Sequence, residues 1–162
     1  MRHLLALILV SLTLSACGLK PLYSGGSTGA VASTLGTVMV EPIAGKNGWL
    51  MRNALNDRLG SAQSTSAKFR LVVALDDQIE GFGVRADDTV TRERRTLRAR
   101  YQLISLATGE TVLDATAGAD AGIDVVSSEY ATIASENTAL ENLTQRVADQ
   151  IVTRLSLYAG GE

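Results

Sequence analysis

Three stretches of the chain carry strand patterns separated by turns. Apolar and polar residues alternate over 69–76 and again over a longer span at 89–106, which is the period of a strand with one buried face. The segment 81–88 between them holds two glycines and two aspartates and predicts a loop. After the turn at 107–110 a weaker pattern follows over 111–126. The three strands are therefore expected to form an antiparallel meander.

Two segments show the spacing of amphipathic helices. From Met51, apolar residues recur at i, i+3, i+4 and i+8, which places them on one helix face. Asn47 or Gly48 can cap the start of this helix, and Gly60 offers the left-handed conformation that ends it. Residues 127–158 contain neither glycine nor proline, and their helix-face positions alternate between spacings of four and three. This second segment predicts one long amphipathic helix.

A β-branched run at 37–41, stopped by Pro42, adds a strand before the first helix. The element order β-α-β-β-β-α predicts an α+β fold, a two-layer sandwich with two helices on one face of a four-stranded, mixed and mostly antiparallel sheet. The helix between the first two strands favours a parallel, right-handed crossover. The other face of the sheet is expected to stay uncovered.

The N-terminus has the pattern of a bacterial lipoprotein signal. A short basic start and an apolar run of eleven residues, 4–14, have the length of a signal peptide, because a membrane-spanning helix needs about 20 apolar residues. Leu14-Ser15-Ala16-Cys17 resembles the lipobox, in which the cysteine is acylated and becomes the first residue. We therefore predict lipidation at Cys17; the alternative is an ordinary secretory signal with a chance cysteine.

The chain length of 162 residues corresponds to one domain, since domains average about 150 residues. We expect a signal peptide at 1–16 and a lipidated N-terminus with a flexible tether at 17–36, where glycine, serine, threonine and alanine dominate. A single α+β domain is expected at 37–162.

Composition excludes several functions. The only histidine is His3 and the only cysteine is Cys17, so the processed chain has no free thiol and no imidazole. Zinc and copper sites, haem ligation, and cysteine or serine–histidine catalysis all need one of these groups. We predict no catalytic residue, no metal and no cofactor. Aromatic residues make up 4% of the chain and the net charge is −2, which argues against nucleic-acid binding. Asp76-Asp77 and Asp87-Asp88 lack the spacing of a calcium loop and are expected to be solvated turns.

Three segments carry a family resemblance: Cys17-Gly18-Leu19-Lys20-Pro21-Leu22-Tyr23, the strand end at 103–110, and Tyr130-Ala131 followed by 147–155. In this order and spacing they resemble the lipopolysaccharide-assembly lipoproteins of the outer membrane, the LptE group, and in particular its alphaproteobacterial branch. The resemblance implies two helices on a four-stranded sheet and a non-enzymatic role.

The resemblance further implies the partners and the location. The protein is expected to plug and help fold the lipopolysaccharide-export β-barrel, and to contact lipopolysaccharide on its way to the outer leaflet. It is expected to be anchored in the outer membrane by its lipid and to face the periplasm, which Gly18 after the cysteine also favours. The alternative is an accessory lipoprotein of a periplasmic lipid-transport ATPase.

One candidate binding site comes from the residues themselves. The arginine stripe consists of Arg92, Arg94, Arg98 and Arg100, which fall on one face of the predicted long strand. The segment 92–100 carries five arginines and one glutamate, whereas the rest of the processed chain has 9 basic and 16 acidic residues. Arginine binds phosphate through two parallel hydrogen bonds, so the stripe suits lipid phosphates or an acidic barrel partner. The alternative is a solvated face whose arginines pair with nearby carboxylates: Asp76, Glu80, Asp114 or Asp120.

Overall fold

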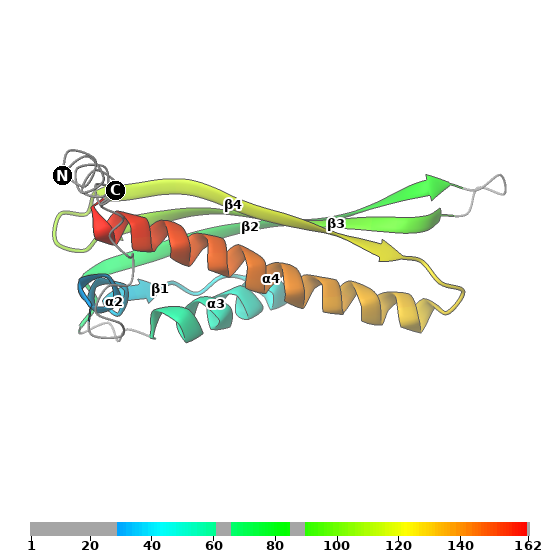
Figure 1. Cartoon of the computed structure of the whole chain (residues 1–162), viewed down its shortest axis with the longest axis horizontal. Helices are drawn as coiled ribbons and strands as arrows, with labels where there is room; N and C mark the ends of the chain where they lie inside the picture. Colours follow the sequence, from blue (N-terminus) through cyan, green and yellow to red (C-terminus); the bar gives the residue numbers. More distant parts are fainter. Residues whose placement is uncertain (1–28, 61–65, 85–89, 162) are drawn as a thin grey trace, which may run out of the picture.

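A four-stranded sheet forms one layer of the protein and helices form the other (Figure 1). The computed structural model describes residues 29–60, 66–84 and 90–161. The strands are β1 (Val38–Val40), β2 (Phe69–Val84), β3 (Val90–Ser105) and β4 (Thr111–Asp124), and they lie in the sheet in that order. β1 pairs parallel to β2, while β2–β3 and β3–β4 are antiparallel. The predicted α+β class and the parallel crossover are both confirmed.

The β2–β3 hairpin is longer than the sequence pattern indicated. Pairing runs from Phe69 opposite Ser105 to Val84 opposite Val90, so residues 81–84, the first half of the segment 81–88 that is expected to be a loop, are strand; residues 85–88 lie outside the described residues. Gly83 adopts a left-handed φ of 77° within this stretch, which an alternation of side chains does not reveal. Strand β3 supplies backbone partners along its whole length, and these extend β2 beyond its apolar half.

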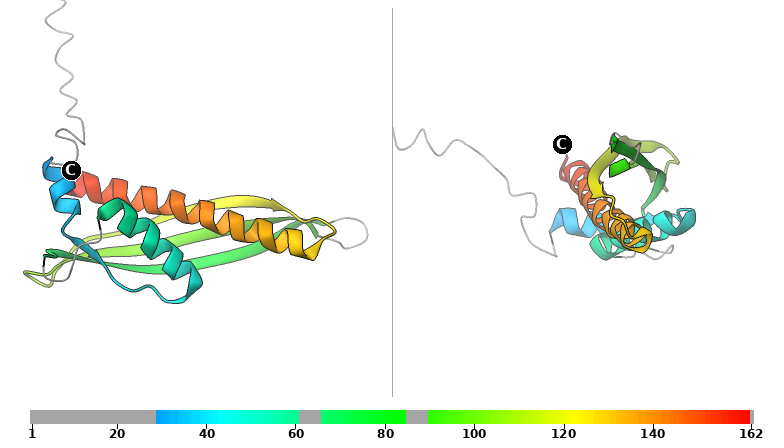
Figure 2. Two further views of the ribbon diagram at one scale, coloured as in Figure 1. Left: turned by 90° about the horizontal axis from the view of Figure 1, so that it is seen from below. Right: turned by 90° about the vertical axis from the view of Figure 1, so that its right-hand side faces the viewer.

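Both long helices pack on one face of the sheet, as expected (Figure 2). α3 (Gly45–Leu59) begins before both predicted caps: its N-cap is Ala44, with no side-chain hydrogen bond, and Gly60 ends it at φ 86° as predicted. α4 (Glu129–Gly160) begins after Ser128, whose side chain accepts a hydrogen bond from the backbone N–H of Ala131. No helix in the described residues is long and apolar enough to cross a membrane.

A third helix, α2 (Ala30–Leu35), lies in the segment that was expected to be flexible tether. Leu35 is 6% exposed and belongs to the core, and Val31 packs against it. Both side chains face the core and α2 lies beside the C-terminal end of α4 (Figure 1), although the composition around them is that of a linker. The remaining residues of the predicted signal peptide and tether, 1–28, lie outside the described residues.

The core is a single layer between the sheet and the helices. The odd-numbered residues Leu97, Ala99, Tyr101 and Leu103 of β3 are at most 2% exposed, as their alternation predicted. α4 contributes the largest share of the other buried side chains, among them Leu140, Leu143, Val147, Ile151 and Leu155.

The molecule is elongated, with α2 and the end of α4 at one end, which we call the proximal end (Figure 1). The end of β2, the beginning of β3 and the start of α4 lie at the opposite end of the molecule, which we call the distal end. Sixteen residues of β3 span about 50 Å at 3.3–3.4 Å per residue. α3 covers only the proximal half of this length (Figure 1). The first turns of α4 extend beyond α3, and Ile133 in these turns is 47% exposed.

Candidate lipid- and partner-binding face

All four arginines of the stripe lie on the sheet face that no helix covers. The stripe runs along β3, an inner strand of the sheet, and each of its side chains is exposed. The even-numbered residues of β3 point to this open face because the odd-numbered ones are buried under the helices. The alternation along the strand therefore predicted the face on which the stripe lies.

Arg100, at the proximal end of the stripe, is held by Asp114 of β4. The two side chains form a paired contact, with Nη2 3.0 Å from Oδ2 and Nε 3.3 Å from Oδ1. Gln102 donates a further hydrogen bond to Asp114 Oδ2 at 2.8 Å. The hydrogen bonds from Arg100 and then Gln102 lower the pKa of Asp114, and the pKa of Arg100 is raised by the same bond. This arginine is committed to a neighbour within the sheet.

Arg92, at the distal end, pairs with a carboxylate that the sequence did not single out. Its Nε lies 3.0 Å from Asp124 Oδ1 at the end of β4, and both side chains are largely exposed. Exposed pairs of this kind contribute at most about 1 kcal/mol, so a stronger anion can displace the aspartate.

Arg94 and Arg98 form no ion pair with any described residue. Arg98 lies opposite Asp76 in the register, but Asp76 instead accepts hydrogen bonds from Gln78 at 3.1 and 3.2 Å. Glu80 is opposite Arg94 and forms no ion pair with it either. These two guanidinium groups are the ones in the stripe whose hydrogen-bond donors are available to a ligand.

Phe82 completes the distal end of the stripe. The centroid of its ring lies 5.3 Å from the guanidinium carbon of Arg94 and 5.9 Å from that of Arg92. A cation over a ring is held in place by the quadrupole of the ring. Phe82 was assigned to a loop by the sequence pattern; the extended pairing of β2 is what brings it beside the arginines.

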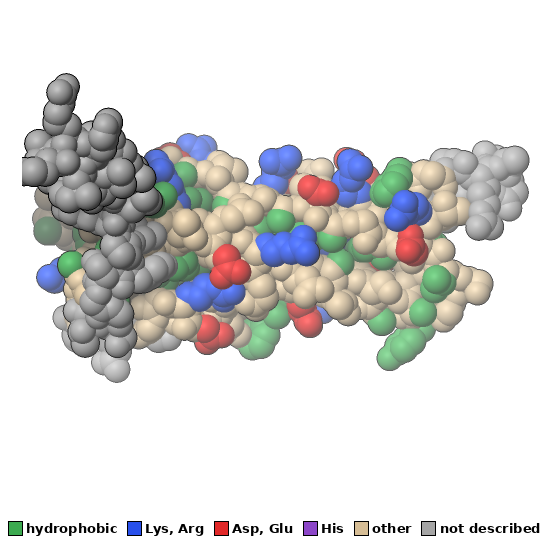
Figure 3. All heavy atoms as spheres, viewed as in Figure 1, with side chains coloured by type: hydrophobic (Ala, Val, Ile, Leu, Met, Phe, Trp, Pro, Cys, Tyr) green, Lys and Arg blue, Asp and Glu red, His purple; other side chains and the backbone are tan. Residues whose placement is uncertain are grey.

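The open face as a whole is balanced in charge, which sequence arithmetic along one strand did not show. Arg70 adds a fifth arginine from β2, while the neighbouring strands contribute Asp76, Glu80, Asp114, Asp120 and Asp124. Basic and acidic side chains are accordingly interspersed along the molecule (Figure 3). The face is therefore a row of arginines flanked by carboxylates, not a broad positive surface.

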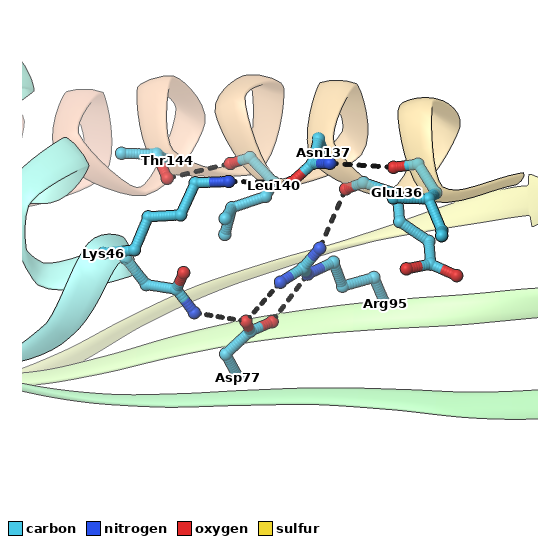
Figure 4. Close-up of polar contacts among 9 residues, drawn as sticks. Lys46, Asp77, Arg95, Glu136, Asn137, Leu140 and Thr144 are labelled. Carbon is cyan, nitrogen blue, oxygen red and sulfur yellow. Dashed lines mark hydrogen bonds and ion pairs between the residues drawn. The ribbon is translucent and has the colours of Figure 1, made fainter. Parts of the chain in front are cut away.

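Arg95 belongs to the segment 92–100 but not to the stripe, because its side chain lies on the helix-covered face of the sheet and is buried. Its guanidinium holds Asp77 through Nε–Oδ1 at 2.8 Å and Nη2–Oδ2 at 2.5 Å, and its Nη1 donates to the backbone carbonyl of Glu136 in α4 at 2.8 Å (Figure 4). Asn47 of α3 also donates to Asp77. Asp77 was expected in a solvated turn; instead it joins β2, β3, α3 and α4.

A hollow of about 220 Å³ is lined by Val72, Ala74, Arg100 and Gln102 near the proximal end. No group of three or more histidine, cysteine, aspartate or glutamate side chains in the described residues is arranged to hold a metal ion.

Replacing Arg100 with glutamine should raise the pKa of Asp114 toward the ordinary aspartate value. The largest cause of the low pKa is the hydrogen bond from Arg100, and this substitution removes its charge. The measurement is a pH titration of the Asp114 carboxyl carbon by NMR. An unchanged midpoint would mean that the pair seen in the structure is not populated in solution; Arg98→Gln serves as the control, and should leave the midpoint in place.

Comparison with known proteins identifies relatives of this chain. A model of the lipopolysaccharide-assembly family LptE matches residues 35–155, whereas no curated protein sequence gives a significant match. A lipoprotein from Caulobacter crescentus has a similar crystal structure, with a TM-score of 0.69 and 24% identity over 83% of this chain and 100% of that one.

Two further structures share the fold. The rare lipoprotein B from Shewanella oneidensis has a TM-score of 0.61 and 8% identity, and the alignment covers 77% of this chain and 96% of that one. A minor lipoprotein from Acinetobacter baumannii has a TM-score of 0.58 and 11% identity, over 75% and 89% of the two chains. At such identities the structures establish the fold alone. The family match covers most of the domain, from the end of α2 to the last turns of α4, and so this chain belongs to the LptE lipopolysaccharide-assembly family.

Proposed function

We propose that the protein is an outer-membrane lipoprotein, anchored through Cys17 and facing the periplasm, that plugs the lipopolysaccharide-export β-barrel and helps it to fold. Membership of the family gives it a role in lipopolysaccharide assembly. The proposed role is non-enzymatic. A sheet face about 50 Å long that no helix covers supports it, because such a face is accessible to the wall of a surrounding barrel.

We further propose that the arginine stripe contacts the phosphate groups of lipopolysaccharide. The observation that carries this proposal is the state of Arg94 and Arg98, which are exposed and without an ion partner among the described residues. Their side chains are neighbours on one face, with Thr96 between them, and Phe82 supports Arg94 from β2. Two free guanidinium groups in a row can each form paired hydrogen bonds with a phosphate.

Reversing both charges, Arg94→Glu with Arg98→Glu, should weaken lipopolysaccharide binding by at least about tenfold, because charge-assisted hydrogen bonds contribute about 1.5–3 kcal/mol each and the glutamates add repulsion. Binding can be measured with the purified, lipidated protein and radiolabelled lipopolysaccharide. The matched control is Arg146→Glu with Arg154→Glu on α4, which changes the net charge equally on the other layer.

Three outcomes would change the assignment. Equal losses in the two double variants would mean that overall charge, and not this face, governs binding. Unchanged binding in both would leave the stripe as a solvated face. If the stripe variant keeps its lipid affinity but no longer co-purifies with the export barrel, the arginines serve the protein partner instead.

Replacing Cys17 with serine should abolish lipid labelling and leave unprocessed precursor, since the chain has no other cysteine. Metabolic labelling with palmitate, followed by membrane fractionation, measures both effects. Label that persists on the variant would rule out the proposed anchor.

A further inference from the structure

Strand β4 has a free edge, and part of that edge is already occupied. The N–H of Gly118 donates to Oε1 of Gln150 and its carbonyl accepts from Nε2, both at 3.2 Å, so the backbone groups of Gly118 point away from β3 toward α4. The amide of Gln150 thus takes the place of one residue of a neighbouring strand.

Farther along the same edge, the equivalent backbone groups have no partner among residues 29–60, 66–84 and 90–161. Orientation alternates along an antiparallel strand, so the N–H and C=O of Asp120 and Gly122 point the same way as those of Gly118. The N–H of Val125 bonds back to Thr91, which fits this alternation. Nothing in the described residues pairs with the outward backbone groups of Asp120 and Gly122. A row of unpaired groups is a template for another strand.

A groove lies beside this free edge, between β4 and α4. Its volume is about 550 Å³. Apolar side chains from both elements, including Ile123, Ala139 and Leu143, line its floor, while Thr138, Asn142 and Arg146 stand along the α4 side. Along α4, Gln150 lies one helical turn beyond Arg146, and its bonds to Gly118 occupy the edge of β4 on the proximal side of the groove.

The two carboxylates on the distal half of β4, Asp120 and Asp124, indicate which kind of strand can pair with its free edge. Asp120 on the open face has no ion partner among the described residues, and Asp124 is held only by the exposed Arg92. Pairing with a second copy about Gly122 would set Asp120 directly opposite the second Asp124, and like charges at such positions are destabilising. A strand with basic side chains on that face would instead be attracted.

We propose that the distal half of β4 accepts an extended segment of a partner protein as a fifth strand. The segment pairs with the backbone of Asp120 and Gly122, places apolar side chains in the groove beside α4, and carries lysine or arginine opposite Asp120. Gln150 sets the limit of the added strand. Such strand addition takes its affinity from main-chain bonds and its specificity from alternate side chains. The inference does not depend on the proposed role in lipopolysaccharide transport.

The probe is an acetylated, amidated peptide of about nine residues in which lysine alternates with valine. It is added to the full-length lipidated protein in phospholipid nanodiscs, and amide hydrogen exchange is followed by NMR. We expect exchange at Asp120 and Gly122 to slow by at least about tenfold, with no change at Thr116 on the far side of Gln150. The same peptide with the backbone nitrogens of its lysines methylated should give no protection, because the lysine opposite Asp120 is the residue whose N–H faces β4.

Two variants test the chemistry. Asp120→Lys should reverse the preference, so that a glutamate–valine peptide protects better than the lysine–valine one. Thr138→Trp fills the groove and should weaken binding at least about fivefold, whereas Thr153→Trp, at an exposed α4 position with the same type of hydroxyl bond to the preceding turn, should not.

The proposal is overturned if no peptide slows exchange at Asp120 and Gly122, or if methylated and unmethylated peptides act alike. It is equally overturned if Asp120→Lys leaves the peptide preference unchanged. A groove that binds a dodecyl chain, sensitive to Thr138→Trp, while both amides exchange freely with every peptide, would be a lipid site and not a strand site.

Discussion

Replacing Asp77 with alanine should lower the free energy of unfolding by about 3 to 5 kcal/mol, because it leaves the buried guanidinium of Arg95 without its counter-ion. Arg95 is 8% exposed, and the side chain of Asp77 is 13% exposed. Water cannot easily replace the lost bonds at this depth. The hydrogen bond from Asn47, which joins the first turn of α3 to β2, is lost in the same step. Urea denaturation followed by circular dichroism measures the effect.

Two controls separate burial from charge. Asp124→Ala breaks the exposed pair with Arg92 and should cost less than about 1 kcal/mol. The double replacement Asp77→Leu with Arg95→Met removes both buried charges and should recover most of the stability lost in Asp77→Ala. A loss in Asp77→Ala no larger than in Asp124→Ala would contradict the burial of the pair.

The position of this pair follows from the uneven cover of the sheet. α3 begins near Asp77, and beyond that point only α4 lies over β3 and β4. Arg95 donates a hydrogen bond to the backbone carbonyl of Glu136 in this region, where fewer apolar side chains are buried between the sheet and α4. Lys46 at the start of α3 bonds to Asn137 of α4 at 2.9 Å in the same region. Polar contacts thus hold the two helices over the sheet where fewer apolar side chains are available.

Periodicity predicted the elements that carry a complete apolar face. The buried row of β3 and the long face of α4 extend over many residues, so a few polar positions did not hide the period. It correctly placed a strand at 69–76 but failed in the distal half of β2, where polar and apolar side chains mix on both faces and two glycines interrupt the pattern. There the pairing with β3 determines the structure, and that information lies in another segment of the chain.

The candidate site was also predicted only in part, because periodicity within one strand shows which side chains share a face but not which neighbours they contact. All four stripe arginines share a face because they alternate along one strand, which the sequence shows directly. Which of them have partners depends on the register of β2 and β4. Asp124 pairs with Arg92 and Asp76 does not pair with Arg98, although both carboxylates lie opposite those arginines in the sheet. Such choices depend on side-chain conformations that no spacing rule contains.

Gly48 was read from the sequence as a possible cap, and the structure gives it another role. It lies within the first turn of α3 and is buried. A Cβ atom at this position would stand 2.5 Å from the Ile43 carbonyl oxygen and 2.8 Å from Ile43 Cγ2. The chain that leaves β1 therefore passes so close to the helix that only a hydrogen atom fits between them.

Gly48→Ala should consequently destabilise the protein by about 1 to 3 kcal/mol, although the same change inside an unobstructed helix stabilises by about 1 kcal/mol. The clash involves backbone, which cannot rotate away as a flexible side chain would. Thermal unfolding measures the sign. Gly122→Ala on β4 is the reference, because an added Cβ there meets no heavy atom within 4 Å, and its effect should stay within about 0.5 kcal/mol. If Gly48→Ala unfolds at or above the temperature of the unmodified protein, the residues between β1 and α3 do not pass the helix as closely as the structure places them.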